Sequence, residues 1–173
     1  MPIMTLPRVR PPFVADERTQ LIGWLDLQRA LVRWKCEGLS ESDAHRVALP
    51  SSPLMTVAGL VSHMRWTEDC WFEMLFLGNR TDNPQFAEGV EDADFLVPGA
   101  SLAQLLDDYE RQCVRSNEIV AAHSLDDQGR HPDFASAKAT LRWMVLHMLE
   151  ETARHVGQLD AIREILDGEK GYY

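Results

Sequence analysis

The 173-residue sequence lacks a long apolar run and lacks an excess of positive charge. Nowhere do eighteen apolar residues follow one another, and the opening segment 1–8 has no apolar stretch of the kind that a signal peptide carries. The formal net charge is -10, which argues against a surface that neutralises nucleic-acid phosphates or an anionic membrane. We therefore expect a cytoplasmic protein without nucleic-acid or membrane partners, acting on small molecules or on other proteins.

Cysteine is also scarce. The three cysteines, Cys36, Cys70 and Cys113, lie far apart in the sequence, and none belongs to a CxxC pair. This spacing indicates neither a thiolate zinc cluster nor a disulfide framework. Because each cysteine lies within an apolar helical pattern, we expect three buried, unreactive thiols.

No segment alternates apolar and polar residues clearly enough to predict a β-strand. Proline and glycine instead divide the chain into four segments with helical periodicity. The helices are expected between Asp16 and Gly38, between Ser52-Pro53 and Gly78, between Ser101 and residues 126–129, and between residues 136–140 and Gly168. The economical interpretation is an all-α, four-helix bundle that forms a single domain over residues 1–173.

The stretch from residue 79 to residue 100 separates the second predicted helix from the third. It is rich in Asn, Asp, Gly and Pro, which is typical of an irregular connection and not of a strand pair. A connection this long inside a compact domain usually crosses the bundle or covers a pocket. We expect it to help shape a substrate site.

The last predicted helix carries polar residues on the stripe that should be apolar throughout. In alternating steps of three and four, this seam reads Leu141, Met144, Met148, Glu151, His155, Gln158, Ile162 and Ile165. A buried, ionised carboxylate is costly unless it is paired or bound to a metal. Since Glu151 and His155 are four residues apart, they can direct an oxygen and a ring nitrogen at one point. His63, at the edge of the apolar face of the second helix, is the candidate third ligand.

Two ordinary interpretations compete with a metal site. Glu151 and His155 could form a plain ion pair within the helix, and His63 could be a core histidine hydrogen-bonded to a neighbour. His147, one turn before Glu151, is a reserve ligand, and Glu68 could orient a ligand, although exposure to water is favoured. Imidazole and carboxylate ligands suit zinc, iron, manganese or nickel. The remaining histidines fall in loops or at helix ends and are expected to be solvated: His45, His123 and His131.

Several motifs stand out in the second and last helices, the most specific being the H-x-G-Q segment from His155 to Gln158. The others are His63 with Glu68 and Trp71, and the segments 141–143, 147–151 and 153–155. Together they resemble the motifs of the DinB-like (YfiT-like) metalloenzyme superfamily, and the resemblance covers nearly the whole chain. The resemblance implies a four-helix bundle with one metal ion held by His63, Glu151 and His155.

At the position of Glu151, many members of this superfamily have a histidine. The His-Glu-His set is similar to the branch that contains the mycothiol-dependent maleylpyruvate isomerase, in which zinc binds a low-molecular-weight thiol. The resemblance therefore implies a transferase or isomerase that uses mycothiol or bacillithiol on an electrophilic substrate. It also implies a divalent metal, with zinc preferred over nickel, iron or manganese, and hydrogen bonds to the ligands from Gln158 or Glu68. Homodimers are common among similar bundles.

Two other functions stay open from the sequence. A three-ligand metal could activate water, which would make the protein a hydrolase. Alternatively, the chain could be a non-catalytic, stress-related binding module whose polar seam residues pair with one another.

Overall fold

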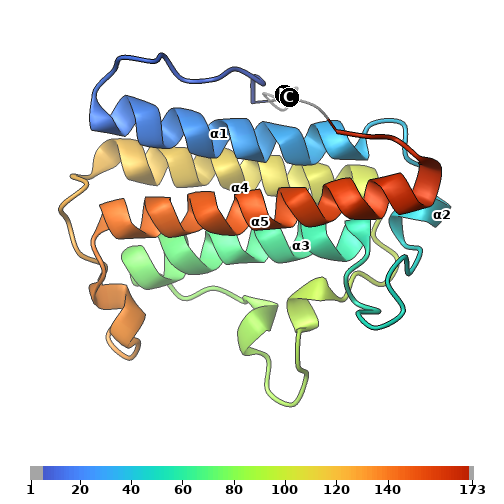
Figure 1. Cartoon of the computed structure of the whole chain (residues 1–173). Helices are drawn as coiled ribbons and strands as arrows, with labels where there is room; N and C mark the ends of the chain where they lie inside the picture. Colours follow the sequence, from blue (N-terminus) through green and yellow to red (C-terminus); the bar gives the residue numbers. More distant parts are fainter. Residues whose placement is uncertain (1–5, 172–173) are drawn as a thin grey trace.

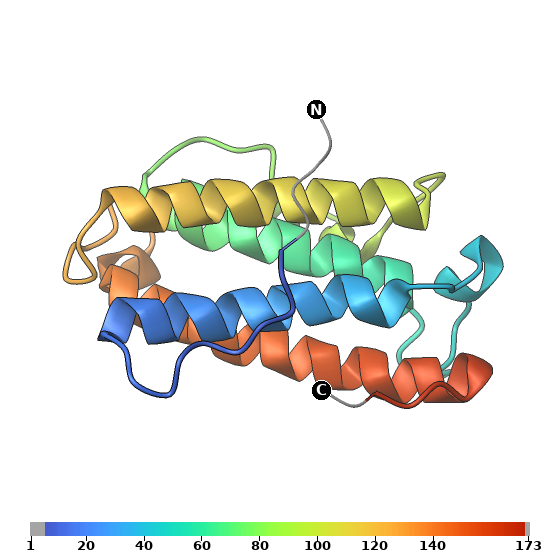
Figure 2. The same cartoon turned by 90° about the horizontal axis from the view of Figure 1, so that it is seen from above.

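The computed structural model describes residues 6–171, which are helical apart from connections and one isolated bridge between Gln128 and Thr140. Four long helices lie side by side: α1 (Glu17–Cys36), α3 (Val57–Glu68), α4 (Leu102–Ala122) and α5 (Leu141–Asp167) (Figure 1). Helix α1 packs mainly against α5, and α3 packs mainly against α4 (Figure 2). The predicted all-α bundle is confirmed.

Side chains at helix boundaries cap three of the long helices. The Asp16 carboxylate accepts a backbone N–H bond at the start of α1, and Ser101 and Gln104 form the capping box of α4. Thr140 caps α5, which ends at Gly168 with a φ of 80°. These side chains satisfy backbone groups that helix ends leave without a partner.

The predicted start of the second helix at Ser52-Pro53 is wrong. Helix α3 begins only at Val57, where the Thr56 hydroxyl accepts the Gly59 N–H at 3.0 Å. The preceding chain folds back so closely that a Cβ on Gly59 would lie 2.4 Å from a backbone oxygen of the 52–56 turn. That turn cannot be part of the helix, because it crosses the first helical turn. A short helix, α2 (Glu41–Ala44), was also not predicted.

Helix α3 continues without a break into a π-helix, η1 (Asp69–Phe76). The Leu77 N–H bonds the Phe72 carbonyl five residues back, at 3.2 Å. π-Helical turns are rare and occur frequently at functional sites. Here the wider turns bury Phe72 and Phe76 and leave the Trp71 ring half-buried, in contact with side chains of α5.

The apolar core divides into two clusters along the bundle axis. One surrounds Leu60 and Tyr109, and the other surrounds Phe72 and Met144. The predicted seam of α5 is buried at Leu141, Met144, Met148 and Ile162. Ile165 was wrongly assigned to the seam, since it is 56% exposed and Leu166 packs against the core instead. A straight helix drifts by about 20° per heptad from a 3.5-residue repeat, so the seam rotates outward before Ile165.

The connection from η1 to α4 is irregular, as predicted, with two short turns: η2 (Pro84–Phe86) and η3 (Ala93–Phe95). The η3 turn packs against α3. Another short turn, η4 (Ala135–Lys138), precedes α5. Among residues 6–171, no helix is long and apolar enough to cross a membrane. Residues 1–5, which belong to the opening segment used in the export prediction, lie outside the described residues.

Candidate metal centre

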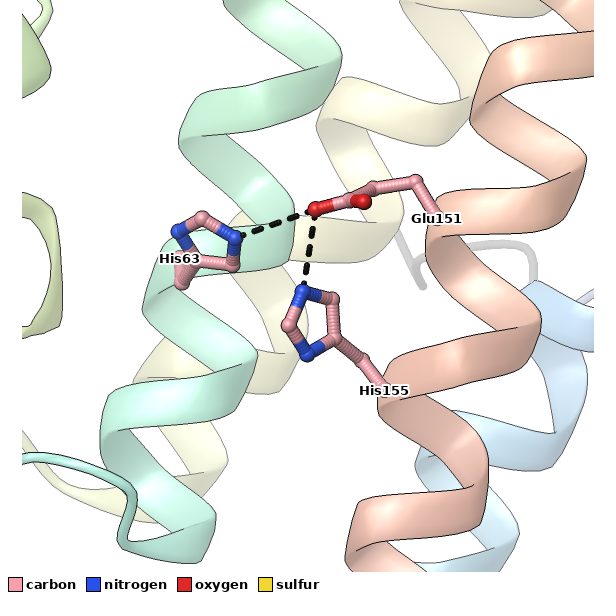
Figure 3. Close-up of side chains that lie close together, drawn as sticks. All are labelled: His63, Glu151 and His155. Atoms are coloured by element: carbon pink, nitrogen blue, oxygen red, sulfur yellow. Dashed lines mark hydrogen bonds and ion pairs between the residues drawn. The ribbon is translucent and has the colours of Figure 1, made fainter. Parts of the chain in front are cut away.

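Three side chains from two facing helices converge between α3 and α5 (Figure 3). His63 comes from α3, and Glu151 and His155 come from consecutive turns of α5. Each offers one ligand atom, and these atoms all lie within 4.8 Å of one another. The structure therefore brings together the three residues that the sequence and the resemblance single out.

The spacing of the ligand atoms suits a small metal ion. The Glu151 Oε1 atom lies 3.4 Å from His63 Nε2 and 3.0 Å from His155 Nε2. Two atoms bound tetrahedrally to zinc at its usual bond lengths lie about 3.3 Å apart. Both distances are close to this value, and the two imidazole nitrogens lie within 4.8 Å of each other, so the side chains must draw together to hold zinc. Two imidazoles with one carboxylate are an ordinary ligand set.

The outward-facing ring nitrogens of both histidines have hydrogen-bond partners. His63 Nδ1 lies 2.5 Å from Asp94 Oδ2, and His155 Nδ1 lies 2.6 Å from Gln158 Oε1. Both partners are acceptors, so the proton of each neutral ring is held on Nδ1. When Nε2 gives up its proton, its lone pair is directed at the centre, which is the tautomer that a metal ligand requires.

Asp94 was not predicted as part of the site. It lies in η3 and is 3% exposed, and its second hydrogen-bond donor is Gln85 Nε2 at 3.0 Å. The Ser62 hydroxyl donates to the Asp94 carbonyl at 2.6 Å, which ties η3 to α3. The Phe95 ring stacks on His63 at a centroid distance of 4.3 Å. The long connection thus orients one ligand, a role its composition indicated only in outline.

The charges at the centre stabilise one another. Burial alone would lower the pKa of His63, but its hydrogen bonds with Asp94 and Glu151 outweigh burial and raise the pKa to about 9. Hydrogen bonds from His155 and His63 hold the pKa of Glu151 far below its usual range. Burial alone would raise the pKa of Asp94, but its hydrogen bonds with His63 and Gln85 lower it, so two carboxylates stay ionised beside the centre. Their combined charge balances that of a divalent cation.

The reserve ligand His147 lies outside the three-residue cluster. Its ring packs against Trp71 and Trp143, with centroid distances of 4.5 Å and 5.3 Å. The nearest carboxylate is Glu150, at 3.9 Å from His147 Nδ1. His147 is therefore part of an aromatic cluster beside the centre.

The favoured interpretation of Glu68 as solvent-facing is wrong, because its side chain is fully buried. Arg29 reaches in from α1, and its Nε and Nη2 atoms donate to the two Glu68 oxygens at 2.7 Å each. Periodicity along the second helix cannot show a partner that comes from the first. Among the described residues, Arg29 is the only one that hydrogen-bonds the Glu68 carboxylate. Glu68 therefore belongs to an ion pair separate from the three converging side chains.

The remaining histidines and the cysteines lie away from the three converging side chains. His45 is exposed, as predicted, whereas His123 is half-buried against Phe76 and the prediction of a solvated ring is wrong for it. His131 is half-buried as well, with Phe134 at a centroid distance of 4.9 Å. Packing against nearby rings accounts for both. The buried state predicted for the cysteines is confirmed for Cys36, Cys70 and Cys113.

The centre touches solvent at its edge. The side chains of His63, Glu151 and His155 are 16%, 14% and 10% exposed. These fractions leave a narrow contact with solvent while most of each ligand is surrounded by protein.

Residues 20–168, which include the whole centre, match the family model described as mycothiol-S-transferase. A search of curated proteins gives no significant match.

Proposed function

Because the chain belongs to the mycothiol-S-transferase family, a DinB-like family, we propose that it transfers the sulfur of mycothiol to an electrophilic substrate with the help of a divalent metal. Membership of the family supports the thiol and the transfer reaction. The convergence of His63, Glu151 and His155 within 4.8 Å supports the metal. This convergence is the single observation on which the metal-dependent mechanism depends.

We propose zinc as the metal, held by His63 Nε2, Glu151 Oε1 and His155 Nε2. Three protein ligands leave a position for a further ligand, as in catalytic zinc sites. A divalent ion bound there would lower the pKa of a coordinated thiol, so that a thiolate is available at neutral pH. Asp94 and Gln158 hold the two imidazoles in the tautomer and orientation that ligation needs.

The nucleophilic sulfur is proposed to come from the cofactor and not from the chain. Burial raises the pKa of the Cys36 and Cys70 thiols to about 12, and that of Cys113 well above its usual range. In the transfer, the cofactor sulfur forms a bond to an electrophilic carbon. The bond from that carbon to its leaving group breaks, the leaving group takes the electron pair, and the thiol proton passes to solvent.

The test combines metal content with thiol-dependent turnover. We would compare the wild type with His63→Ala, Glu151→Ala and His155→Ala by elemental analysis, using His45→Ala and Glu150→Ala as exposed controls. Each ligand variant is expected to lose stoichiometric metal and to lose at least about 100-fold in activity. Both controls are expected to retain metal and activity.

Turnover would be followed with monobromobimane in the presence and absence of mycothiol. Consumption that requires the thiol supports a transferase. Equal consumption without any thiol would contradict this proposal and indicate a hydrolase. Equal metal content in all six proteins would show that the proposed ligands are wrong. Absence of stoichiometric metal from all six would favour a non-catalytic module.

We also propose that residues 1–173 form one domain, since all four long helices pack together and the family match spans them. The small-molecule thiol is the partner that the family supports. A cytoplasmic location, the absence of nucleic-acid partners and a possible homodimer stay predictions. Bacillithiol is an alternative thiol, which replacing mycothiol by bacillithiol in the assay would test. An isomerase reaction is an alternative to transfer, which analysis of the products would test.

A further inference from the structure

Three aromatic rings lie together beside the candidate metal centre. Trp71 comes from η1, and Trp143 and His147 come from the first turns of α5. The two indole rings lie 5.4 Å apart, and His147 lies 4.5 Å from Trp71 and stacks on Trp143 at 5.3 Å, with 21° between the planes. We name these three residues the aromatic shelf.

The shelf and the metal centre are parts of one row on α5. Trp143, His147, Glu151 and His155 follow one another at intervals of four residues. A row of this spacing is inclined to the helix axis, so it passes gradually from one side of the helix to another. Trp143 is 49% exposed and His155 is 8% exposed, which shows that the row leads from solvent into the interior.

A matching row runs along the facing helix. His63, Thr67 and Trp71 are also four residues apart, and the half-buried Trp71 ring meets the two rings of α5. Each four-residue step corresponds to about 6 Å along a helix. The shelf therefore begins about one step from Glu151, which is within the length of a molecule with one or two rings.

The chemistry of the shelf selects flat, unsaturated groups. Its three members present ring faces and edges, and the exposed part of Trp143 is available for stacking. A half-exposed indole is a large apolar surface to leave in water, and ligand sites are lined mainly by apolar and aromatic side chains. The thiol must reach the metal itself, so the position beside the metal is left to the second reactant.

We propose that the aromatic shelf binds the electrophilic co-substrate and that this co-substrate carries an aromatic or other planar unsaturated group. The stacked ring places the reacting carbon toward Glu151 and His155. This inference rests on the proposed function for the identity of the two reactants. The shelf itself can be tested without turnover.

The test is a titration of the protein with syn-(methyl,methyl)bimane, an unreactive planar relative of monobromobimane, followed through the indole N–H signals in ¹⁵N–¹H NMR spectra. Single Trp→Phe variants would assign the five signals. The Trp71 and Trp143 signals are expected to shift on titration, while those of Trp24, Trp34 and Trp66 stay unchanged. Acetamide, a small non-aromatic amide, is expected to shift none of them.

Trp143→Ala is expected to weaken binding of the bimane about fivefold. Trp24→Ala is the matched control, because Trp24 is 43% exposed on α1, and it is expected to leave binding unchanged. Equal shifts at all five indoles, no shift at all, or unaltered binding in Trp143→Ala would overturn the proposal. Competition between mycothiol and the bimane for the shelf would also overturn it, because the shelf would then belong to the thiol.

Turnover gives a second measurement. With thiol saturating, Trp143→Ala is expected to raise KM for monobromobimane about fivefold and to leave KM for iodoacetamide unchanged. An equal effect on both electrophiles would contradict a stacking role. If the wild type shows no thiol-dependent turnover, the proposed function fails, whereas the NMR titration still decides whether the shelf binds planar groups.

Discussion

Two polar clusters lie in the interior of this bundle, and they differ in whether they satisfy themselves. The Arg29 cluster is closed: all three nitrogens of the guanidinium have acceptors at 2.7–2.9 Å. Its members are Arg29, Glu68, Asp26 and Asn117. The single cation therefore meets acceptors from three other residues, and each of its nitrogens is satisfied within the cluster.

The His63 cluster is arranged differently. Its members are His63, Glu151, His155 and Asp94. Here two imidazole Nε2 atoms approach a single carboxylate oxygen, while the opposite ring nitrogens are already held by acceptors. Potential ligand atoms therefore converge on one point between two helices. Burial of charge alone therefore does not indicate a reactive site, whereas convergence of ligand atoms does.

Glu68→Ala is the largest test of this difference. It leaves Arg29 buried without its main counter-charge, and the free energy of unfolding is expected to fall by about 3–5 kcal/mol. Metal content of the folded fraction is expected to stay unchanged. Urea denaturation and elemental analysis measure the two quantities. The double variant Arg29→Met with Glu68→Leu is expected to recover most of the loss, because apolar residues of similar size remove the unpaired charge.

If Glu68→Ala instead removed metal while stability stayed within about 1 kcal/mol of the wild type, the two clusters would not be independent. The Arg29 ion pair would then have to support the metal ligands across the bundle.

Asp94→Asn changes the His63 cluster at its outer edge. An amide oxygen can still accept the His63 N–H but carries no charge, so His63 becomes a weaker and less firmly oriented ligand. Metal affinity is expected to fall about 10- to 100-fold, measured by competition with a chromophoric chelator. Asp92→Asn is the matched control, since Asp92 is an exposed neighbour and loses the same charge. Equal affinities in Asp94→Asn and the control would show that Asp94 does not act on the metal.

The His63 cluster is also expected to make the free energy of unfolding depend on pH. The pKa of His63 is raised from 6.5 in the unfolded chain to about 9 in the fold. Its stabilising contribution is therefore complete below pH 6.5 and is lost as pH rises through about 9. In chelator-treated protein, the wild type is expected to lose on the order of 1 kcal/mol more than His63→Ala between pH 6.5 and 9.5, measured by urea unfolding.

Bound metal is expected to abolish that difference, because it replaces the proton on His63. If the wild type and His63→Ala lost the same unfolding free energy as pH rises, the hydrogen bonds from His63 to Asp94 and Glu151 would not stabilise the fold, and the arrangement described around His63 would be wrong.

Spacing within one helix made the fold and part of the centre predictable from the sequence. The caps at Asp16 and Ser101 and the pair Glu151 and His155 each depend on residues three or four apart. These separations are fixed by helix geometry, so no knowledge of the rest of the chain is needed.

The partners of His63 and Glu68 could not be predicted in this way. Asp94 is 31 residues from His63, in an irregular connection, and Arg29 is 39 residues from Glu68, on another helix. Which side chains meet across such distances depends on packing. The fold-back of residues 52–56 onto Gly59 depends on packing as well, and it moved the start of α3.

The smallest effect is expected from the cysteines, and it bears on where the reactive sulfur comes from. Cys113 is 0% exposed and adjoins the Arg29 cluster, where the nearby Glu68 carboxylate adds to burial in raising the pKa of its thiol. A thiol there cannot attack an electrophile in the folded protein. Cys113→Ala, Cys36→Ala and Cys70→Ala are each expected to change thiol-dependent turnover by less than about twofold. Iodoacetamide is expected to label these thiols only after unfolding, as mass spectrometry would show. A cysteine variant that abolished turnover while retaining metal would move the reactive sulfur into the chain and remove the need for an external thiol.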